Sequence, residues 1–516
     1  MQTNKFYNIV SAHLHKYVFT CFYKIVCTCL CGMLFFGSVL INCPEAVFAN
    51  EKDSDVITLK VCNWEEYIDM GDWDEEELIE LENGVEILGE NDMTVDFENW
   101  YYETTGQRVE VEYSCFGTNE DLYNQLTMGD TYDLVCPSEY MIMKLMAEDK
   151  LVPYDETFFD EEIETNYYIK NVSPYIRNIF DTNEIKGEKW SEYAAGYMWG
   201  VTGTLYNPEL VSKEDVSTMS FYNNTKYSKK ITLKDNVRDS YFVALGALYE
   251  DKLLDKDFIA SKNYSSELAK IMNDTNPDTI NKAEKLLQDM VDNAYSLETD
   301  SGKADMVSGK VVANYQWSGD AVYAMDQAEE DELYLDFAVP KECTNMWFDG
   351  WVMLKSGIDG DAKKKAAAQS FVNFLSRPDN AVRNMYFIGY TSSIAGNEKD
   401  DTVYEYMKWC YGDEEGEEYY PVGYFFSGNN EDEKYMLKTT KEQTRRQLFA
   451  QYPSQEVMER AAIMQYFDKE QNKNINQMWI NIRCFNVDKT PLFVWIVAAG
   501  IVIGAILLYL RKKINN

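Results

Sequence analysis

The chain has 516 residues and a formal net charge of −39, with 46% hydrophobic and 14% aromatic residues. The first 49 residues carry +2 and the last 26 carry +3, so the body at 50–490 carries −44. Such a body repels nucleic acid and phosphate ligands and attracts cations. Both histidines, His13 and His15, precede the body, which disfavours histidine-based catalysis and His-ligated zinc there. The six body cysteines form no C-x-x-C pair, so we expect no metal site and no cofactor.

Residues 1–49 predict a secretory signal peptide. The apolar run at 25–42 follows a lysine-bearing segment, and Val47-Phe48-Ala49 supplies a small-residue cleavage pattern. An uncleaved anchor is the alternative, because the segment before the apolar run is long. Lipidation at Cys43 is disfavoured, since Asn42 stands where a small residue is expected.

Strand and helix patterns alternate from residue 56 onward. They predict a strand at 56–61, a helix at 95–102 that stops at Gly106, a strand at 109–113, a helix at 119–128, and a buried strand within 132–140 that leads into a new helix. The acidic stretch 71–93 predicts a solvated helix or a mobile loop. The alternation indicates an α/β sheet, in which ligands gather at the carboxyl ends of the strands.

The rest of the body predicts a division into two lobes. About 430 residues are too many for one ordinary core. The uncharged, β-prone segment 197–207 is long enough to pass from one lobe to the other. Further on, 363–377 predicts an amphipathic helix closed by Pro378, with Phe371, Phe374 and Leu375 facing inward.

The C-terminal segment 492–510 contains nineteen uncharged residues. As a helix rising ~1.5 Å per residue it approaches the ~30 Å hydrocarbon thickness of a bilayer, and it predicts a transmembrane anchor. The basic residues that follow predict that the tail 511–516 is cytoplasmic, which places the body outside the cell on a single-pass anchor.

Eight segments in collinear order resemble the bacterial spermidine/putrescine-binding proteins of the type II periplasmic-binding fold. They are NWEEY (63–67), YDLVCPSEY (132–140), YMWGVTGTLYN (197–207), KDNVRDS (234–240), YQWSGD (315–320), MWFDGW (346–351), FVNFLSRPDNA (371–381) and IGYTSS (388–393). The likeness covers about 57–480, with 71–93 as an acidic insertion. It implies an ABC-transporter solute-binding protein that delivers its ligand to permease subunits.

The resemblance also implies a ligand site. Polyamines are ammonium groups joined by methylenes, so their site needs carboxylates for the ends and aromatic walls along the chain. The walls would be Trp64, Trp317 and Trp347. The remaining expected ligand-binding residues are Glu66, Tyr67, Ser138, Tyr140, Asn236, Asp239, Asp349, Tyr390 and Gln465. Of the carboxylates, Asp349 is the strongest candidate, because an acid bracketed by aromatic residues needs a charged partner or solvent.

The chain departs from the family pattern in the segment KDNVRDS (234–240). Asn236 stands where the family has an acid, and Asp239 replaces a longer glutamate. One carboxylate fewer at that end favours a dication such as putrescine over the trication spermidine.

The resemblance further implies a fold with hinge crossovers near 201, 346 and 396. Lobe one would comprise 55–200 and 347–396, and lobe two 201–346 and 397–485. The predicted function is a membrane-tethered extracellular polyamine-binding protein for an ABC importer, not an enzyme. Three alternatives stay open: a binding protein for another small cation or an amino acid, an extracellular hydrolase that uses two carboxylates, and a sensor that binds polyamine without transporting it.

Overall fold

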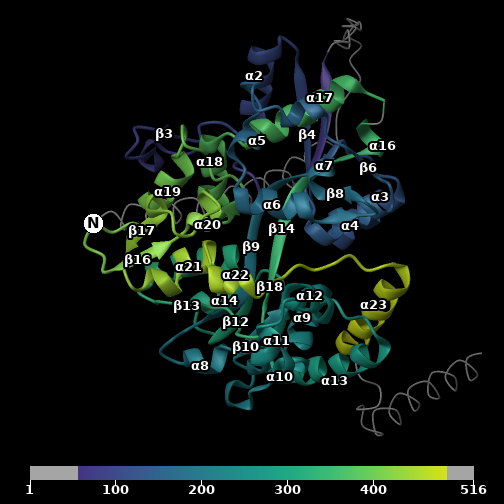
Figure 1. The fold of residues 1–516 in the computed structure, drawn as a ribbon, viewed down its shortest axis with the longest axis vertical. Coiled ribbons are helices and arrows are strands. Elements are labelled where there is room, and N and C mark those ends of the chain that lie inside the picture. The colour runs from purple at the N-terminus through teal and green to yellow at the C-terminus, as the bar shows by residue number, and fades with distance from the viewer. Residues whose placement is uncertain (1–55, 359, 485–516) are drawn as a thin grey trace, which may run out of the picture.

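The computed structural model describes residues 56–358 and 360–484, and Figure 1 shows their arrangement. The predicted signal peptide 1–49, the predicted anchor at 492–510 and the predicted tail at 511–516 lie outside these residues.

A mixed twelve-stranded sheet runs through the molecule. The main path of the sheet is β11-β10-β12-β9-β14-β5-β1-β4, and four short strands join it at β9 and β14. The path contains β1 (Ile57–Trp64), β4 (Val109–Phe116), β5 (Leu134–Val135), β9 (Ala194–Tyr206), β10 (Ile231–Lys234), β11 (Ser296–Glu298), β12 (Ala313–Trp317) and β14 (Thr344–Leu354). The joining strands are β6 (Leu151–Val152), β13 (Asp336–Ala338), β15 (Thr391–Ser392) and β18 (Ala461–Ala462).

Two long strands connect the halves of this sheet. The first part of β9 pairs with β14 up to Val201, and from Thr202 onward β9 pairs with β12. Every residue of β9 and of β14 is buried, so neither strand has a solvent-facing side. On one side of this pair lie β5, β1 and β4, and on the other lie β12, β10 and β11. The predicted lobe boundaries stay a prediction, although this change of partner falls at the predicted crossover near 201.

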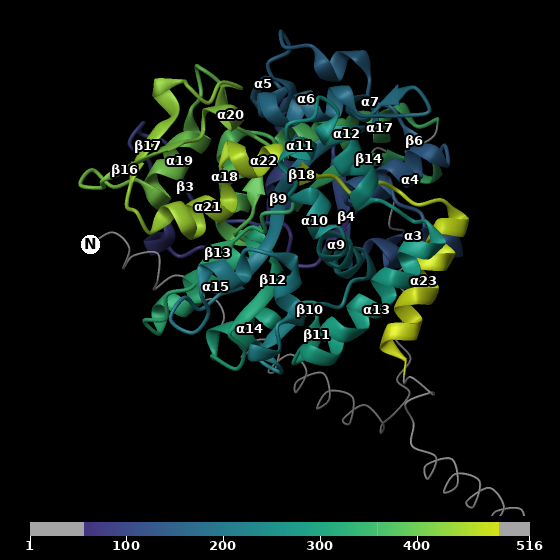
Figure 2. The ribbon, with the colours of Figure 1, turned by 60° about the horizontal axis from the view of Figure 1, so that its bottom comes forward.

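Helices cover both halves of the sheet. Around β1, β4 and β14 pack α2 (Met93–Thr105), α3 (Asn119–Met128), α4 (Glu139–Ala147) and α17 (Ala362–Leu375). Around β10, β12 and β9 lie α9 (Val237–Leu248), α13 (Pro277–Asn293), α14 (Gly302–Val307), α15 (Ser318–Glu330) and α23 (Lys469–Arg483). Figure 2 shows α23, in yellow, beside α13.

A third group of elements comes from the later part of the chain. It includes α18 (Pro378–Ile388), α19 (Thr402–Tyr411), α20 (Gly423–Phe426), α21 (Gln447–Gln451) and the hairpin of β16 (Glu418–Pro421) and β17 (Met436–Thr439). Figure 1 shows this group, in green to yellow-green, on one side of the sheet. It contacts both halves, since α20 packs on α6 (Pro174–Thr182) and α21 packs on α15.

The strand and helix patterns in the first third of the body are confirmed. The helix at 119–128 has the bounds that were predicted, and α2 ends at Gly106, whose φ of 71° is a left-handed conformation suited to glycine. The inward-facing residues of 363–377 are buried as expected. Pro378 opens a new helix, α18, because proline is tolerated in the first turn of a helix.

The acidic insertion 71–93 is a short hairpin instead of the predicted helix or mobile loop. A 3-10 turn at Glu75–Glu77 leads into the paired strands β2 (Ile79–Glu80) and β3 (Glu86–Ile87). Its apolar residues Trp73, Ile79, Leu81 and Ile87 are buried, so the hairpin is docked on the body. The sequence did not predict the hairpin, because the few apolar residues stand among many acidic ones and form no clear strand pattern.

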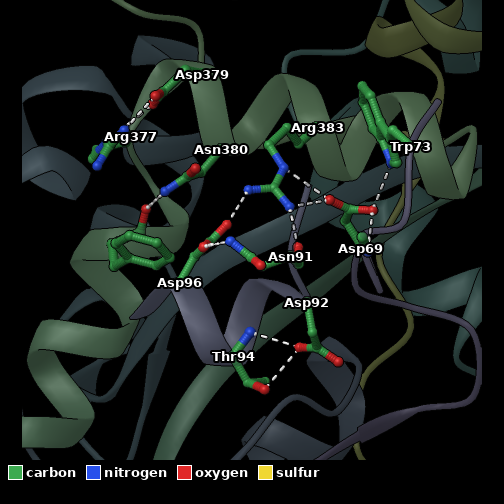
Figure 3. Close-up of polar contacts among 12 residues, drawn as sticks. Asp69, Trp73, Asn91, Asp92, Thr94, Asp96, Arg377, Asp379, Asn380 and Arg383 are labelled. Atoms are coloured by element: carbon green, nitrogen blue, oxygen red, sulfur yellow. Dashed lines mark hydrogen bonds and ion pairs between the residues drawn. The ribbon is translucent and has the colours of Figure 1, made fainter. Parts of the chain in front are cut away.

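Arg383 on α18 holds the base of this hairpin, as Figure 3 shows. The Arg383 guanidinium pairs with Asp69 before the hairpin, donates to the Asn91 carbonyl after it (2.8 Å), and contacts Asp96 at 2.8 Å. Asp69 also accepts a hydrogen bond from the Trp73 indole at 3.0 Å. One buried cation therefore ties both ends of the insertion to the body.

The predicted fold class included a C-terminal transmembrane helix, and we correct it to the α/β body alone. Across 56–358 and 360–484, no helix is both long and apolar enough to cross a membrane. The longest of these helices, α13, has 17 residues, which corresponds to ~26 Å at ~1.5 Å per residue, and it carries charged side chains along its length. The segment 492–510, on which the prediction rested, lies outside the described residues.

Candidate functional site

The candidate residues follow the carboxyl ends of four strands. Tyr67 comes after β1, Ser138 after β5, Asp239 after β10, and Trp317 closes β12. Within each half the neighbouring strands run parallel, so their carboxyl ends meet at the same edge of the sheet. Asp349 lies in the middle of β14, where the β9–β14 register shifts between Phe348 and Gly350. Such an irregularity re-aims side chains and is common beside binding sites.

Asp349 and Asp239 are the two buried carboxylates among the candidates, and Asp349 is held by hydroxyl groups. It is 5% exposed, and it accepts hydrogen bonds of 2.7 Å from the Tyr67 hydroxyl at Oδ2 and from the Ser138 hydroxyl at Oδ1. Burial raises the pKa of Asp349 to about 6, while these two hydrogen bonds lower it. Within the described part of the chain no cation lies within ion-pair distance of this carboxylate.

Aromatic rings pack beside Asp349. The Tyr67 and Tyr390 rings meet edge to face with centroids 5.4 Å apart, and Trp347 lies 5.5 Å from Tyr390. Glycines allow this packing: a Cβ at Gly200 would lie 2.6 Å from the Trp347 ring, and one at Gly319 would lie 2.2 Å from the Tyr390 ring. The rings therefore sit directly on the backbone of β9 and of α15.

Tyr390 connects the rings to a cluster of charges. Its hydroxyl donates to Asp320 Oδ1 at 2.9 Å. Asp320, in the first turn of α15, lies 3.4 Å from the Lys303 ammonium and 3.7 Å from that of Lys234. Lys303 also pairs with Asp300 at 2.7 Å. The Asp320 carboxylate is thus paired with two lysines of the protein, Lys234 and Lys303.

Lys234 leads from this cluster to Trp317 and Asp239. The Lys234 ammonium lies 4.1 Å from the centroid of the Trp317 ring, and the Trp317 indole N–H donates to Asp239 Oδ1 at 3.3 Å. Burial raises the pKa of Asp239 to about 6, against the lowering effects of Lys234, the indole hydrogen bond and Arg238. Asp239 is held in place by the N-cap of α9, where the Asn236 side chain accepts from the backbone N–H groups of Arg238 and Asp239.

Arg238 closes the arrangement into a circuit of contacts. Its guanidinium lies 4.6 Å from the Tyr140 ring centroid and 3.9 Å from that of Phe467. The amide of Asn119 donates to the Tyr140 hydroxyl (3.0 Å) and to the Ser138 hydroxyl (3.1 Å), and Ser138 returns the path to Asp349. The circuit joins elements from both halves of the sheet.

Eight of the twelve predicted ligand-binding residues are brought together. They are Tyr67, Ser138, Tyr140, Asp239, Trp317, Asp349 and Tyr390 on the circuit, with Trp347 against Tyr390. Asn236 supports the circuit as a helix cap rather than as a contact within it. Their role in binding stays a prediction.

Two predicted residues lie apart from the circuit, and a third touches it through its backbone carbonyl. Trp64 packs on the Phe116 ring at 4.7 Å, and Glu66 is exposed with a left-handed φ of 53°. Gln465 reaches the circuit only through its carbonyl oxygen, which accepts from Arg238 Nη2 at 2.6 Å. Gln465 also lines an open surface hollow of about 610 Å³ together with Lys270, Asn273 and Asp274.

Four circuit residues were not among the predicted ligand-binding residues: Asn119, Lys234, Arg238 and Asp320. Lys234 opens the segment KDNVRDS and Asp320 ends the segment YQWSGD, so both lay inside the segments that carry the resemblance. The sequence did not suggest Lys234 as a site residue, because a binding site for cations is expected to contain acidic side chains and not basic ones. Over 56–358 and 360–484, no group of three or more metal-ligating side chains that could hold an ion is found.

Most of the described body matches a known family. Residues 93–408 match the family model of the bacterial extracellular solute-binding proteins. The chain belongs to this family. The candidate residues at the carboxyl ends of strands agree with this membership, and the family is one of binding proteins and not of enzymes.

This solute-binding protein is similar in sequence to several named binding proteins. The spermidine/putrescine-binding periplasmic protein of Escherichia coli is 27% identical over 311 residues, covering 58% of this chain and 76% of the relative. The putrescine-binding periplasmic protein PotF of E. coli is 27% identical over 275 residues, covering 52% and 67%. The resemblance drawn from the eight segments is confirmed by these relatives.

Solved structures show the same fold. The spermidine/putrescine substrate-binding protein PotD of Streptococcus pneumoniae superposes with a TM-score of 0.51 at 22% identity, covering 83% of this chain and 98% of that one. The Tp0655 (TpPotD) lipoprotein of Treponema pallidum gives a TM-score of 0.53 at 16% identity, covering 83% and 99%. The α/β periplasmic-binding fold predicted from the resemblance is therefore confirmed, without the membrane helix.

Proposed function

We propose that this solute-binding protein takes up a polyamine, putrescine or spermidine, and presents it to an ABC importer. The observation that carries the proposal is Asp349: among residues 56–358 and 360–484, this buried carboxylate has hydroxyl partners only, and it lies beside the Trp347 and Tyr390 rings. A buried carboxylate is costly unless it meets a cation. A ligand ammonium would supply that cation, and the rings would cover the adjoining methylenes.

The magnitudes favour an organic ammonium over a metal ion. A carboxylate about 4 Å from an ammonium contributes ~4 kcal/mol before desolvation at an effective dielectric near 20. A cation over an aromatic face adds roughly 0.5–2 kcal/mol, most with Trp. Only an organic cation with an apolar chain uses both terms. The names of the curated relatives, which bind spermidine and putrescine, support this choice.

The proposed two-lobe arrangement explains how ligand binding would be coupled to transport. The circuit joins residues after β1 and β5 to residues after β10 and β12, so a ligand held there would tie the two halves together. Ligand binding would then favour the closed form, and that form would dock on permease subunits of the importer.

An amino acid is the second candidate ligand, and Arg238 is the observation that favours it. A carboxylate ligand needs a cationic partner, and Arg238 lies on the circuit. Its guanidinium is already engaged, because it stacks on Tyr140 and Phe467 and donates to the Gln465 carbonyl. This engagement makes the diamine the better proposal.

Isothermal titration of the purified protein with putrescine, spermidine, spermine and a set of α-amino acids tests the proposal. We expect heat from at least one polyamine and loss of binding in Trp347→Ala, whose ring wall is removed. Trp409→Ala is the matched control, since Trp409 stacks on Tyr406 and lies outside the circuit. Absence of heat with all three polyamines, or displacement of putrescine by an α-amino acid, would overturn it.

A further inference from the structure

Lys234 is a buried cation within the circuit itself. It closes β10, its side chain is 1% exposed, and its ammonium donates to the Thr299 carbonyl at 2.9 Å. The same ammonium lies 3.3 Å from Glu298 and 3.7 Å from Asp320. Its fourth neighbour is the face of Trp317, 4.1 Å from the ring centroid.

This environment is the one that a ligand ammonium requires. Carboxylates supply the charge, a carbonyl supplies an acceptor, and a Trp face adds a cation–π contact. Glu298 is itself fixed in this position, because Oε2 accepts from the Gly302 backbone and Oε1 accepts from Asn314. The protein has therefore built an ammonium position and filled it with its own lysine.

Because Lys234 occupies this ammonium position, fewer carboxylates of the circuit remain without an ion pair for a ligand to bind. Asp320 already pairs with Lys234 and Lys303. Of the three circuit aspartates, Asp349 and Asp239 are the two without an ion pair within 4 Å among residues 56–358 and 360–484. These two carboxylates without an ion pair match two ammonium groups.

We propose that Lys234 is a specificity-determining residue: it occupies a third ammonium position of the site, so that the site takes a diamine and discriminates against triamines and tetraamines. The inference rests on the proposed polyamine function and narrows it to one class of ligand. A diamine places one ammonium at Asp349 and the other at Asp239. The third ammonium of a triamine would meet the Lys234 ammonium, and like charges in a buried site repel strongly.

The test compares putrescine with spermidine by titration on the whole protein. Lys234→Met removes the resident charge and keeps an apolar stem of similar length. Lys234→Met/Glu298→Gln removes the pair together, so that no buried glutamate is left without its cation. Lys303→Met is the matched control, because Lys303 pairs with the same Asp320 but is not among the cations on the Trp317 face.

The wild-type protein is expected to bind putrescine about tenfold or more tighter than spermidine, and both Lys234 variants should lower this ratio by about tenfold. The Lys303→Met ratio should stay near that of the wild type. If both Lys234 variants fail to fold, the wild-type ranking decides.

Tighter wild-type binding of spermidine, an unchanged ratio in the folded Lys234 variants, or an equal shift in Lys303→Met would overturn the role of Lys234 alone. No binding of either amine would instead overturn the proposed function, and this inference with it. The two failures are thus distinguishable in one set of titrations.

Discussion

The Tyr67 hydroxyl donates a 2.7 Å hydrogen bond to Oδ2 of Asp349, a residue 282 positions later in the chain. The bond joins the end of β1 to the middle of β14, and Ser138 holds the other carboxylate oxygen at the same distance. Both partners are neutral, so they orient the carboxylate without cancelling its charge. That combination is suited to receiving a cation from outside the protein.

Replacing Asp349 with Asn tests this relationship directly. We expect polyamine affinity to fall by about 2–5 kcal/mol, because the ligand ammonium loses its buried counter-charge. The stability of the ligand-free protein should not fall, since a desolvated charge is removed and the amide can keep one hydrogen bond. Titration calorimetry measures the first effect and thermal unfolding the second.

Ser138→Ala is the matched control for that substitution. It removes one hydrogen bond to Asp349 and leaves the charge, so affinity should change by only about 0.5–1.5 kcal/mol. An Asp349→Asn protein that binds as tightly as the wild type would show that Asp349 does not hold the ammonium.

Binding should also depend on pH in a defined window. The pKa values of Asp349 and Asp239 are both raised to about 6 by burial, and an ammonium ligand needs both carboxylates ionised. Affinity should therefore fall as the pH drops from about 7 to about 5, by up to about tenfold per group and pH unit.

The ligand-free protein should respond in the opposite direction. Because the folded-state pKa of each aspartate lies above its unfolded value near 3.9, protonation favours the folded state. This contribution to stability is present below about pH 4 and is lost as the pH rises through about 6. Unfolding and titration measured across pH 4–8, on the wild type and on Asp349→Asn, separate the two; an affinity that is flat between pH 7 and pH 5 would contradict the assignment.

Gly200→Ala should disturb the site without touching a ligand. The added Cβ would lie 2.4 Å from Ser318 Oγ and 2.6 Å from the Trp347 ring, so the ring must move. We expect a loss of about 1–3 kcal/mol in stability, as for other overpacked cores, together with weaker polyamine binding. Gly117→Ala is the control, because its Cβ would meet its nearest atom at 3.6 Å. Equal behaviour of the two variants in unfolding and titration would show that Trp347 is not fixed by β9.

Arg383 should matter for stability and not for ligand binding. Arg383→Met leaves Asp69 and Asp96 without their shared cation and frees the base of the insertion (Figure 3), which should cost about 3–5 kcal/mol of unfolding free energy. Arg377→Met is the control, since Arg377 pairs with its near neighbour Asp379 and is more exposed; we expect about 1 kcal/mol or less. Loss of polyamine affinity in a folded Arg383→Met protein would indicate that the insertion takes part in the site.

Four of the eight predicted residues that the structure brings together share one property. Tyr67, Ser138, Asp239 and Trp317 each follow or close a strand of the parallel parts of the sheet, where the fold brings chain positions together whatever their separation. Gln465 touches the circuit through its backbone and Glu66 lies apart from it, and their role in binding stays a prediction. Gln465 follows the short strand β18 in an irregular segment near the end of the body. The direction of Glu66 depends on its left-handed backbone conformation, which the hydrophobic pattern of the sequence does not predict.

By itself the sequence determined the family, the alternation of strands and helices, and the aromatic and acidic residues around the site, because these depend on local periodicity and on motifs in collinear order. Tertiary structure alone decided that the acidic insertion is a docked hairpin clamped by Arg383, and that Lys234 lies on the face of Trp317. The physical reason is that a charge has no fixed meaning along the chain. Whether it is solvated, paired or left open for a ligand depends on which distant side chains the fold places within a few ångströms of it.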